Sequence, residues 1–271
     1  MFKLAPNGTE TVLHTFTNVN DGGLPYASVL RDKAGNLYGT TYQGGANGSG
    51  FGTVFKLAKN GSFTTLYAFT GGSDGKNPDG GLIRDSAGNL YGTTIHGGGF
   101  SSGVVFKVAP DGAETVLYTF TENAGDGGLP IAGVIMDKAG NLYGTTAYGG
   151  TSENGTVFKL APDGTETVLY SFAGGTDGSL PYAGLMMDGA GNLFGTTTAG
   201  GANFGVVFKL APNGKETVLH TFGGYPVDGS TPLFGSLIKD ADDGVGYLFG
   251  TTQGGGTDNG IAKGTIFKVH K

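Results

Sequence analysis

The sequence predicts an all-β protein, a five-bladed β-propeller built from four-stranded antiparallel blades. One block of about fifty residues recurs five times, and its G-T-T motif begins at Gly39, Gly92, Gly144, Gly195 and Gly250. Each block holds four short runs rich in aromatic and β-branched residues, separated by Gly-rich turns. No stretch combines helical periodicity with capping residues. A repeat of this length with four strands is typical of a propeller blade.

The fourth block shows how the strands, named A to D, are assigned. The run A-G-L-M-M-D at 183–188 predicts strand A, and the turn G-A-G-N follows it. The run L-F-G-T-T at 193–197 predicts strand B. A Gly-rich loop leads to strand C at 206–210 (V-V-F-K-L), and after the turn P-N-G strand D spans 217–222 (T-V-L-H-T-F). Four strands joined in this way form an antiparallel meander.

One domain over 1–271 is expected to hold the five blades. Their approximate bounds are 24–70, 77–121, 129–173, 180–223 and 231–271. The fifth block lacks a strand D, and the run E-T-V-L-H-T-F at 10–16 has that strand's sequence. We therefore expect the N-terminal strand to complete the last blade, because an open ring would leave two unpaired sheet edges.

Two segments compete for strand C of that last blade, F-K-L at 2–4 and F-K-V at 267–269. We expect residues 264–269 to occupy it, because they carry the full G-T-I-F-K-V strand. Residues 1–5 would then fray or pair with a neighbouring molecule, in a protein that is otherwise expected to be a monomer. The alternative is an array that continues in a longer parent protein with more blades.

Composition narrows the classes of function. Glycine makes up 56 of 271 residues and recurs at the same places in each block, so it indicates turns rather than disorder. The net charge is −6 without a basic run, which argues against a nucleic-acid partner. Cysteine is absent, so disulfides and thiolate metal sites are excluded. No apolar run is long enough to predict a membrane span, and the first residues do not resemble a signal peptide.

Two stretches carry a resemblance to a known family. The run V-F-K-L-A-P-D-G-T-E-T-V-L-Y-S-F at 157–172 and G-N-L-Y-G-T-T at 140–146 resemble the Gloeo/Verruco ("GloVer") tandem repeat of bacterial surface-associated proteins. The likeness covers essentially the whole chain. The run 183–194 is also similar to the inner strands of NHL-like propellers, at the level of fold only. The resemblance implies an extracellular or periplasmic location for the parent protein, and it supplies no catalytic residues.

A ligand site, if present, is expected on the face where the D-to-A and B-to-C loops meet, because these loops are long and vary between blocks. The A-to-B and C-to-D turns on the other face are short and nearly uniform. The candidate ligand-binding residues on the loop-rich face are Tyr42, His96, Tyr148, Gln253, Asp21, Asp74, Asp126, Asp177 and Asp228. Exposed rings there could stack on sugars, beside polar side chains that bind hydroxyl groups.

Two sets of repeated aspartates need interpretation. Asp32, Asp85, Asp137, Asp188 and Asp240 each precede an A-to-B turn, where we expect them to accept backbone N–H bonds of that turn. Glycoside cleavage needs two carboxyl groups with different pKa values, which five equivalent acids do not offer. The second set, in D-G before a proline, is also expected to stabilise turns, with a calcium site as the minority interpretation. Four scattered histidines do not predict a zinc site.

These observations favour a non-enzymatic extracellular propeller, a binding or interaction scaffold that recognises a glycan through the loop-rich face. We predict no catalytic residues, no metal site and no cofactor, with calcium as the one exception left open. A polysaccharide or another surface protein would be the partner. One alternative is a carbohydrate-active enzyme, a glycoside hydrolase or lyase with a site near the propeller axis. Another is a purely structural array fragment.

Overall fold

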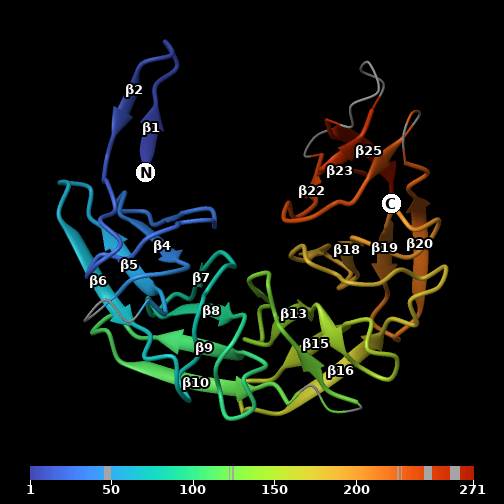
Figure 1. Cartoon of the computed structure of the whole chain (residues 1–271), viewed down its shortest axis with the longest axis horizontal. Helices are drawn as coiled ribbons and strands as arrows, with labels where there is room; N and C mark the ends of the chain where they lie inside the picture. The colour runs from blue at the N-terminus through green and yellow to red at the C-terminus, as the bar shows by residue number, and fades with distance from the viewer. Residues whose placement is uncertain are drawn as a thin grey trace. The chain divides into compact units, whose positions relative to one another are not determined.

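The computed structural model describes residues 1–271 except 46–49, 122, 124, 225, 227, 241–245 and 257–262. The described residues form strands, turns and loops without a helix, so the predicted all-β class is confirmed (Figure 1). Among them there is accordingly no helix that could cross a membrane. The chain divides into two compact units, Met1–Thr119 and Phe120–Lys271, which are described separately.

The first unit contains a two-stranded hairpin and two four-stranded antiparallel sheets whose strands follow chain order. The hairpin pairs β1 (Phe2–Leu4) with β2 (Glu10–Val12). The next sheet consists of β3 (Leu30–Arg31), β4 (Leu37–Thr41), β5 (Thr53–Leu57) and β6 (Phe63–Ala68). The last sheet of this unit consists of β7 (Ile83–Arg84), β8 (Leu90–Thr94), β9 (Val104–Val108) and β10 (Glu114–Thr119).

The second unit has two four-stranded sheets, one three-stranded sheet and two short strand pairs. One four-stranded sheet consists of β12 (Ile135–Met136), β13 (Leu142–Thr146), β15 (Thr156–Leu160) and β16 (Glu166–Ser171). The other consists of β17 (Met186–Met187), β18 (Leu193–Thr197), β19 (Val206–Leu210) and β20 (Glu216–Thr221). The three-stranded sheet is β22 (Ile238–Lys239), β23 (Tyr247–Thr252) and β25 (Thr265–His270). The short pairs are β11 (Gly127–Gly128) with β14 (Tyr148–Gly149), and β21 (Gly229–Ser230) with β24 (Gly254–Gly255).

Four blocks therefore form the predicted A–B–C–D meander, and the A, B and C strands of the fifth block pair as expected. Strand β25 lies in the strand C position beside β23, which confirms the assignment of 264–269. The number of blades in a complete ring stays a prediction.

The N-terminal residues form a hairpin that the sequence analysis did not predict. Strand β2 pairs with β1, in the register that joins β5 to β6: Phe2 lies opposite Val12 as Phe55 lies opposite Thr65. Residues 2–4 thus form strand C of their own hairpin instead of fraying. Among the described residues the sheet that contains β25 has three strands, and its completion by residues 10–16 stays a prediction. A short turn closes the hairpin locally, and local closure costs less chain entropy than pairing across the sequence.

Neighbouring sheets in each unit pack through aromatic rings that the repeat places in register. The strand C phenylalanine crosses the glycine of G-T-T on strand B: a Cβ atom on Gly144 would lie 2.6 Å from Cζ of Phe158. The phenylalanine after strand D meets the strand C ring of the following sheet, as Phe172 meets Phe208 with centroids 5.2 Å apart at 68°. These contacts explain why the rings at both aromatic positions are buried in the four-stranded sheets, as Phe158, Phe172 and Phe208 are.

The D-to-A and B-to-C loops of one block meet at the same end of its sheet, as predicted. Short antiparallel bridges join them in every block: β11 to β14, β21 to β24, Gly23 to Gln43, Lys76 to His96, and Ser179 to Ala199. The A-to-B and C-to-D turns lie at the opposite end of the strands. The two ends of each sheet can therefore be considered separately in the search for a site.

Candidate functional site

The D-G aspartates, which were predicted to stabilise turns, do so through their carboxylates. Asp74 is buried and accepts hydrogen bonds from Tyr67 Oη at 2.9 Å and from the backbone and hydroxyl of Thr70. Corresponding bonds anchor the other members, with His14 bound to Asp21, Thr121 to Asp126, Tyr170 to Asp177 and His220 to Asp228. Each carboxylate thus ties the end of strand D to the loop that follows it.

The other candidate residues on the loop-rich end are spread over separate blocks. Tyr42 lies against Tyr26, with centroids 5.5 Å apart, and its carbonyl accepts a bond from Asn77 Nδ2 at 2.9 Å. The backbone of His96 bridges to Lys76, and Gln253 donates its N–H to Thr231. Tyr148 is exposed and lies in β14. Parts of these loops, 46–49 and 257–262, lie outside the described residues.

Ligand and calcium binding at this end stay predictions. In the described part of the chain no group of three or more His, Asp or Glu side chains could hold a metal ion.

The aspartates before the A-to-B turns also behave as predicted. Asp32 accepts bonds from the backbone N–H of Asn36 at 2.9 Å, from Asn36 Nδ2 at 2.8 Å and from Tyr38 Oη at 3.1 Å. The bonds from Asn36 are the main reason that the pKa of Asp32 falls to about 2. Asp85 has the same set of partners, and its pKa is also lowered, because these bonds outweigh the opposing effect of its burial. Both carboxyl groups are therefore ionised at neutral pH.

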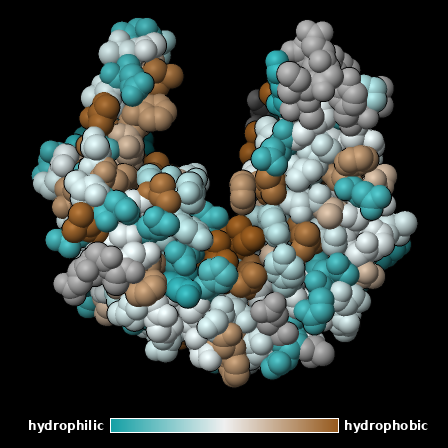
Figure 2. All heavy atoms as spheres, viewed as in Figure 1, coloured by the Kyte–Doolittle hydropathy of each residue, from teal (hydrophilic) through white to brown (hydrophobic). Residues whose placement is uncertain are grey.

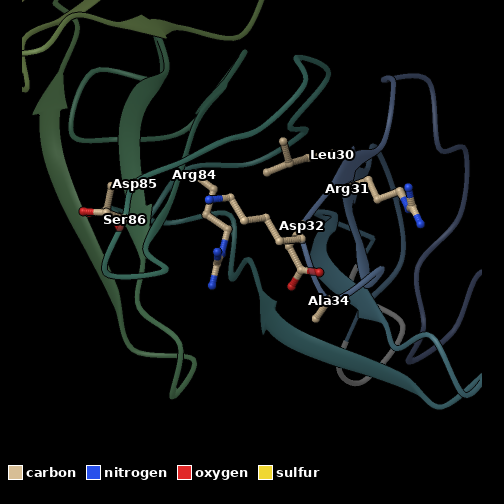
Figure 3. A pocket seen from close by; sticks show the side chains of 8 residues that line it. Leu30, Arg31, Asp32, Ala34, Arg84, Asp85 and Ser86 are labelled. Carbon is tan, nitrogen blue, oxygen red and sulfur yellow. The ribbon is translucent and has the colours of Figure 1, made fainter.

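A cavity of about 590 Å³ lies beside these turns in the first unit, at the end opposite the loops. It is lined by the end of β3 with its turn and by the end of β7 with its turn: Leu30, Arg31, Asp32, Lys33, Ala34, Arg84, Asp85 and Ser86. Figure 3 shows Arg84 and Asp32 at the space between the two strand ends, while Arg31 extends away from it. The sequence-based expectation placed a site on the other face.

Three cations, Arg31, Lys33 and Arg84, contribute to the lining. Among the described residues, none of their nitrogen atoms has a carboxylate oxygen within 4.0 Å. The neighbouring aspartates are instead occupied by the asparagine and tyrosine of their own turns. The cavity therefore offers unpaired positive charge to a ligand, and an anionic group is the ligand that this charge favours.

Arg84 is the cation that the surrounding structure holds most closely. Its guanidinium carbon lies 5.7 Å from the ring centroid of Tyr38, which belongs to the preceding sheet and is buried. On its other side the guanidinium lies over the turn of its own strand, where a Cβ on Gly88 would come within 2.7 Å of Arg84 Nη2. Stacking of this kind leaves the N–H groups at the edge of the guanidinium free to bind a carboxylate or a sulfate.

The residue type at the repeat position of these arginines varies between blocks. The second residue of β3 and of β7 is Arg31 and Arg84, and the same position of β12, β17 and β22 holds Met136, Met187 and Lys239. The sequence analysis gave this position no role. Its divergence between otherwise equal repeats was the signal that could have identified the site.

Comparisons with known proteins agree with the repeat and the fold. The model of the Gloeobacter/Verrucomicrobia repeat matches residues 1–136 and 121–271. A search of curated proteins found no match to the chain.

Among solved structures, a gluconolactonase from Xanthomonas campestris has a TM-score of 0.55 at 14% identity, covering 91% of this chain and 77% of the other. A sialidase from Trypanosoma rangeli, in complex with 2,3-difluorosialic acid, has a TM-score of 0.51 at 12% identity, covering 92% and 45%. An extracellular domain from B. thetaiotaomicron has a TM-score of 0.55 at 12% identity, covering 88% and 27%.

The four-stranded antiparallel sheets and these structural likenesses define a repeat protein with a propeller-like all-β fold. The chain belongs to the Gloeobacter/Verrucomicrobia repeat family, as the resemblance of its blocks predicted.

The prediction of a non-enzymatic scaffold is contradicted. Proteins that share the fold include the gluconolactonase and the sialidase, so this architecture is one that enzymes use. The prediction rested on the near-identity of the blocks, which was thought to remove the asymmetry of an active site. Arg84 and its methionine counterparts show that the blocks differ at the strand that lines the cavity.

Proposed function

We propose that the protein is a carbohydrate-active enzyme whose substrate carries an acidic group, bound in the cavity between the ends of β3 and β7. The observation that carries this proposal is the set of unpaired cations around the cavity, with Arg84 stacked on Tyr38. The names of two structures that share the fold support a sugar-derived substrate: one is a gluconolactonase, and the other holds a derivative of sialic acid.

The charge state of the lining favours elimination over hydrolysis. Hydrolysis by two carboxyl groups needs one that stays protonated to protonate the leaving group. Asp32 and Asp85 both have lowered pKa values, so neither supplies that proton near pH 7. In elimination the ionised carboxylate of Asp32 or Asp85 would take the proton next to the substrate's carboxylate, while the bond to the leaving sugar oxygen breaks and that oxygen takes a proton from water. Negative charge builds up on the substrate as its proton is removed. A guanidinium bound to the carboxylate stabilises this charge. A lyase acting on a uronic-acid polysaccharide is therefore the form of the enzyme that we propose.

A panel of polysaccharides tests this proposal. Uronate-containing polymers such as polygalacturonate, alginate and hyaluronan would be incubated with the protein beside neutral glucans and xylans. We expect the ultraviolet absorbance of an unsaturated uronate product with an acidic polymer and no reaction with the neutral ones. New reducing ends without that absorbance would show hydrolysis in place of elimination, and turnover of neutral polymers alone would contradict an acid-binding site.

We further propose that the parent protein acts outside the cytoplasm, extracellularly or in the periplasm. The repeat family and the extracellular domain that shares the fold support this location. A polymeric substrate, which cannot enter a cell intact, is consistent with it. Detection of the parent protein in surface, periplasmic or secreted fractions would support the location, and detection in the cytoplasmic fraction alone would contradict it.

A further inference from the structure

The two aspartates beside the cavity of the first unit point in different directions relative to Arg84. Arg84 ends β7 and extends toward the preceding sheet, where it stacks on Tyr38. Asp85 follows Arg84 directly, and its N–H still bonds across the turn to the carbonyl of Asn89. Adjacent residues of an extended strand project to opposite sides, so the Asp85 carboxylate leaves the backbone away from Tyr38. Figure 3 shows the side chains of Arg84 and Asp85 diverging.

Asp32 occupies the equivalent position one block earlier, and the same alternation turns it toward Arg84. Arg31 ends β3 and extends away from the cavity, so the residue after it projects to the cavity side. Figure 3 shows Asp32 and Arg84 at the same space, reached from two neighbouring sheets. A ligand held by Arg84 therefore has the carboxylate of Asp32 in front of it.

Tyr38 connects the cation and the carboxylate. Its buried ring lies 5.7 Å from the guanidinium carbon of Arg84, and its hydroxyl donates to Asp32 Oδ2 at 3.1 Å. Asp32 Oδ1 accepts the backbone N–H of Asn36 at 2.9 Å, so both oxygens of the carboxylate are fixed. Arg84 and Asp32 do not form an ion pair within 4.0 Å. The two charges are thus held apart by one ring, with room for a ligand group between them.

The second unit contains a copy of this arrangement without the cation. Tyr143 donates to Asp137 Oδ2 at 3.0 Å, as Tyr38 does to Asp32. Met187 replaces Arg84 and belongs to the same apolar cluster as Tyr143. The bond between tyrosine and aspartate therefore has a role in the turn that needs no cation. The combination of this bond with a facing cation beside a cavity is a feature of the first unit.

Given the lyase function proposed above, we propose that Asp32 is the group that takes up the proton, while Arg84 binds the carboxylate of the same sugar unit. The proton moves from the carbon next to that carboxylate to an oxygen of Asp32. The electrons of the C–H bond form a carbon–carbon double bond, the bond to the leaving sugar oxygen breaks, and that oxygen takes a proton from water. The carboxylate and the acidic proton lie on adjacent carbon atoms, so a cation and a base on facing sheets can reach both.

Tyr38 is the positioning residue of this pair. Its ring supports Arg84, and its hydroxyl fixes the rotation of the Asp32 carboxylate. The bonds from Asn36 and Tyr38 also keep Asp32 ionised, with a pKa of about 2. Loss of the hydroxyl alone would leave the ring under Arg84, so it should affect the proton transfer more than the binding of the acidic group.

Equivalent substitutions in the two units separate the catalytic role from the role in the turn. Asp32→Asn and Asp137→Asn change carboxylates that accept the same bonds from their own turns. Tyr38→Phe and Tyr143→Phe remove the equivalent hydroxyls, and Phe194 shows that phenylalanine is compatible with this register.

Turnover of polygalacturonate, alginate and hyaluronan would give kcat and KM for each variant. Affinity electrophoresis in gels that contain the same polymers would measure binding without turnover, and circular dichroism would verify folding.

We expect Asp32→Asn to lower kcat by roughly 100-fold or more, because it removes the group that accepts the proton. Its KM and its binding of the polymer should stay at the parental values. Tyr38→Phe should lower kcat by about 10-fold, again with KM unchanged, because the carboxylate is no longer held in one orientation. Asp137→Asn and Tyr143→Phe should keep the parental kcat and KM.

A folded Asp32→Asn variant with the parental kcat would overturn the assignment, and so would an equal loss of kcat in Asp137→Asn. If Asp32→Asn does not fold, Tyr38→Phe decides: a parental kcat in that variant would overturn the assignment. A parent protein that neither binds nor cleaves any of the polymers would overturn the proposed function, and this assignment with it. Turnover by the parent protein separates the two cases.

Discussion

A left-handed backbone conformation recurs at the residue before the proline of each D-to-A loop. Leu24, Asn77, Leu129, Leu180 and Thr231 have φ angles between 54° and 58°. This region is unfavourable for leucine and for β-branched residues, and a residue that occupies it costs about 1–3 kcal/mol. The residue is held there because its backbone connects two sheets. The N–H of Leu180 binds the carbonyl of Asn154 in the preceding block, and its carbonyl accepts from Thr198 in its own block.

Replacement of Leu180 by asparagine should relieve part of this cost. Asparagine tolerates the left-handed region better than leucine does. The second block already carries Asn77 there, and Asn77 Nδ2 donates to the carbonyl of Tyr42 at 2.9 Å. We expect Leu180→Asn to raise the unfolding free energy by about 1 kcal/mol, measured by urea denaturation. Leu180→Ala, which removes the side chain without favouring this φ, should give no gain; a loss of stability in Leu180→Asn would contradict the explanation.

At the scale of the strand, the first residue of strand D introduces a buried acid between neighbouring blocks. Glu114, Glu166 and Glu216 each have a buried Oε1 atom without a hydrogen-bond partner in the described structure. Burial, and then the charge of Asp74, raise the pKa of Glu114 to about 7. Burial and the charges of Asp126 and Asp177 raise the pKa values of the other two to about 7 as well. The three aspartates are held in place by their own hydrogen bonds, so each glutamate lies beside a fixed carboxyl group.

The stability of the protein should therefore fall as the pH rises from about 4.5 to about 7 and level off above that range. In this interval the glutamates keep their protons in the folded state but lose them in the unfolded state. The free energy of unfolding therefore decreases as the pH rises. The three-fold variant Glu114→Gln, Glu166→Gln, Glu216→Gln should flatten the melting temperature over this interval and melt higher than the parent protein at pH 8. Glu10→Gln is the matched control, because Glu10 begins β2 in the same repeat position but is exposed. An unchanged pH profile in the three-fold variant would contradict the assignment.

Strand order, the aromatic core and the turn role of the aspartates could be predicted from the sequence, because each depends on contacts inside one repeat or between adjacent repeats. The hairpin of β1 with β2 could not, since residues 2–4 and 267–269 carry nearly the same strand and the sequence did not show that residues 2–4 pair locally. The cavity was missed for another reason. The position of Arg84 holds Arg, Met or Lys in different blocks, and this variation alone does not predict a site. Only the structure shows that the ends of β3 and β7 line one cavity.

On the scale of the whole molecule, near-identical blocks provide the framework, and the proposed function depends on the few positions where they differ. The cavity of the first unit combines turn aspartates found in every block with cations found in only some of them. The framework residues already have partners within the repeat, so the cations are the groups left to bind a substrate. Methionine is compatible with the fold at the position of Arg84, because Met136 and Met187 occupy the same register in two other sheets.

The most direct test of the acidic-carbohydrate site compares Arg84→Met with Met187→Arg in the turnover of the uronate polymer that the protein cleaves. Arg84→Met removes the stacked cation while installing a residue that the fold accepts at that register, and Met187→Arg is the control that changes the same position elsewhere. A charge-assisted bond of about 1.5–3 kcal/mol predicts a fall in kcat/KM of roughly 10- to 100-fold for Arg84→Met, with unchanged melting temperature. Met187→Arg should keep full activity. Equal kcat/KM for Arg84→Met and the parent protein would contradict the site.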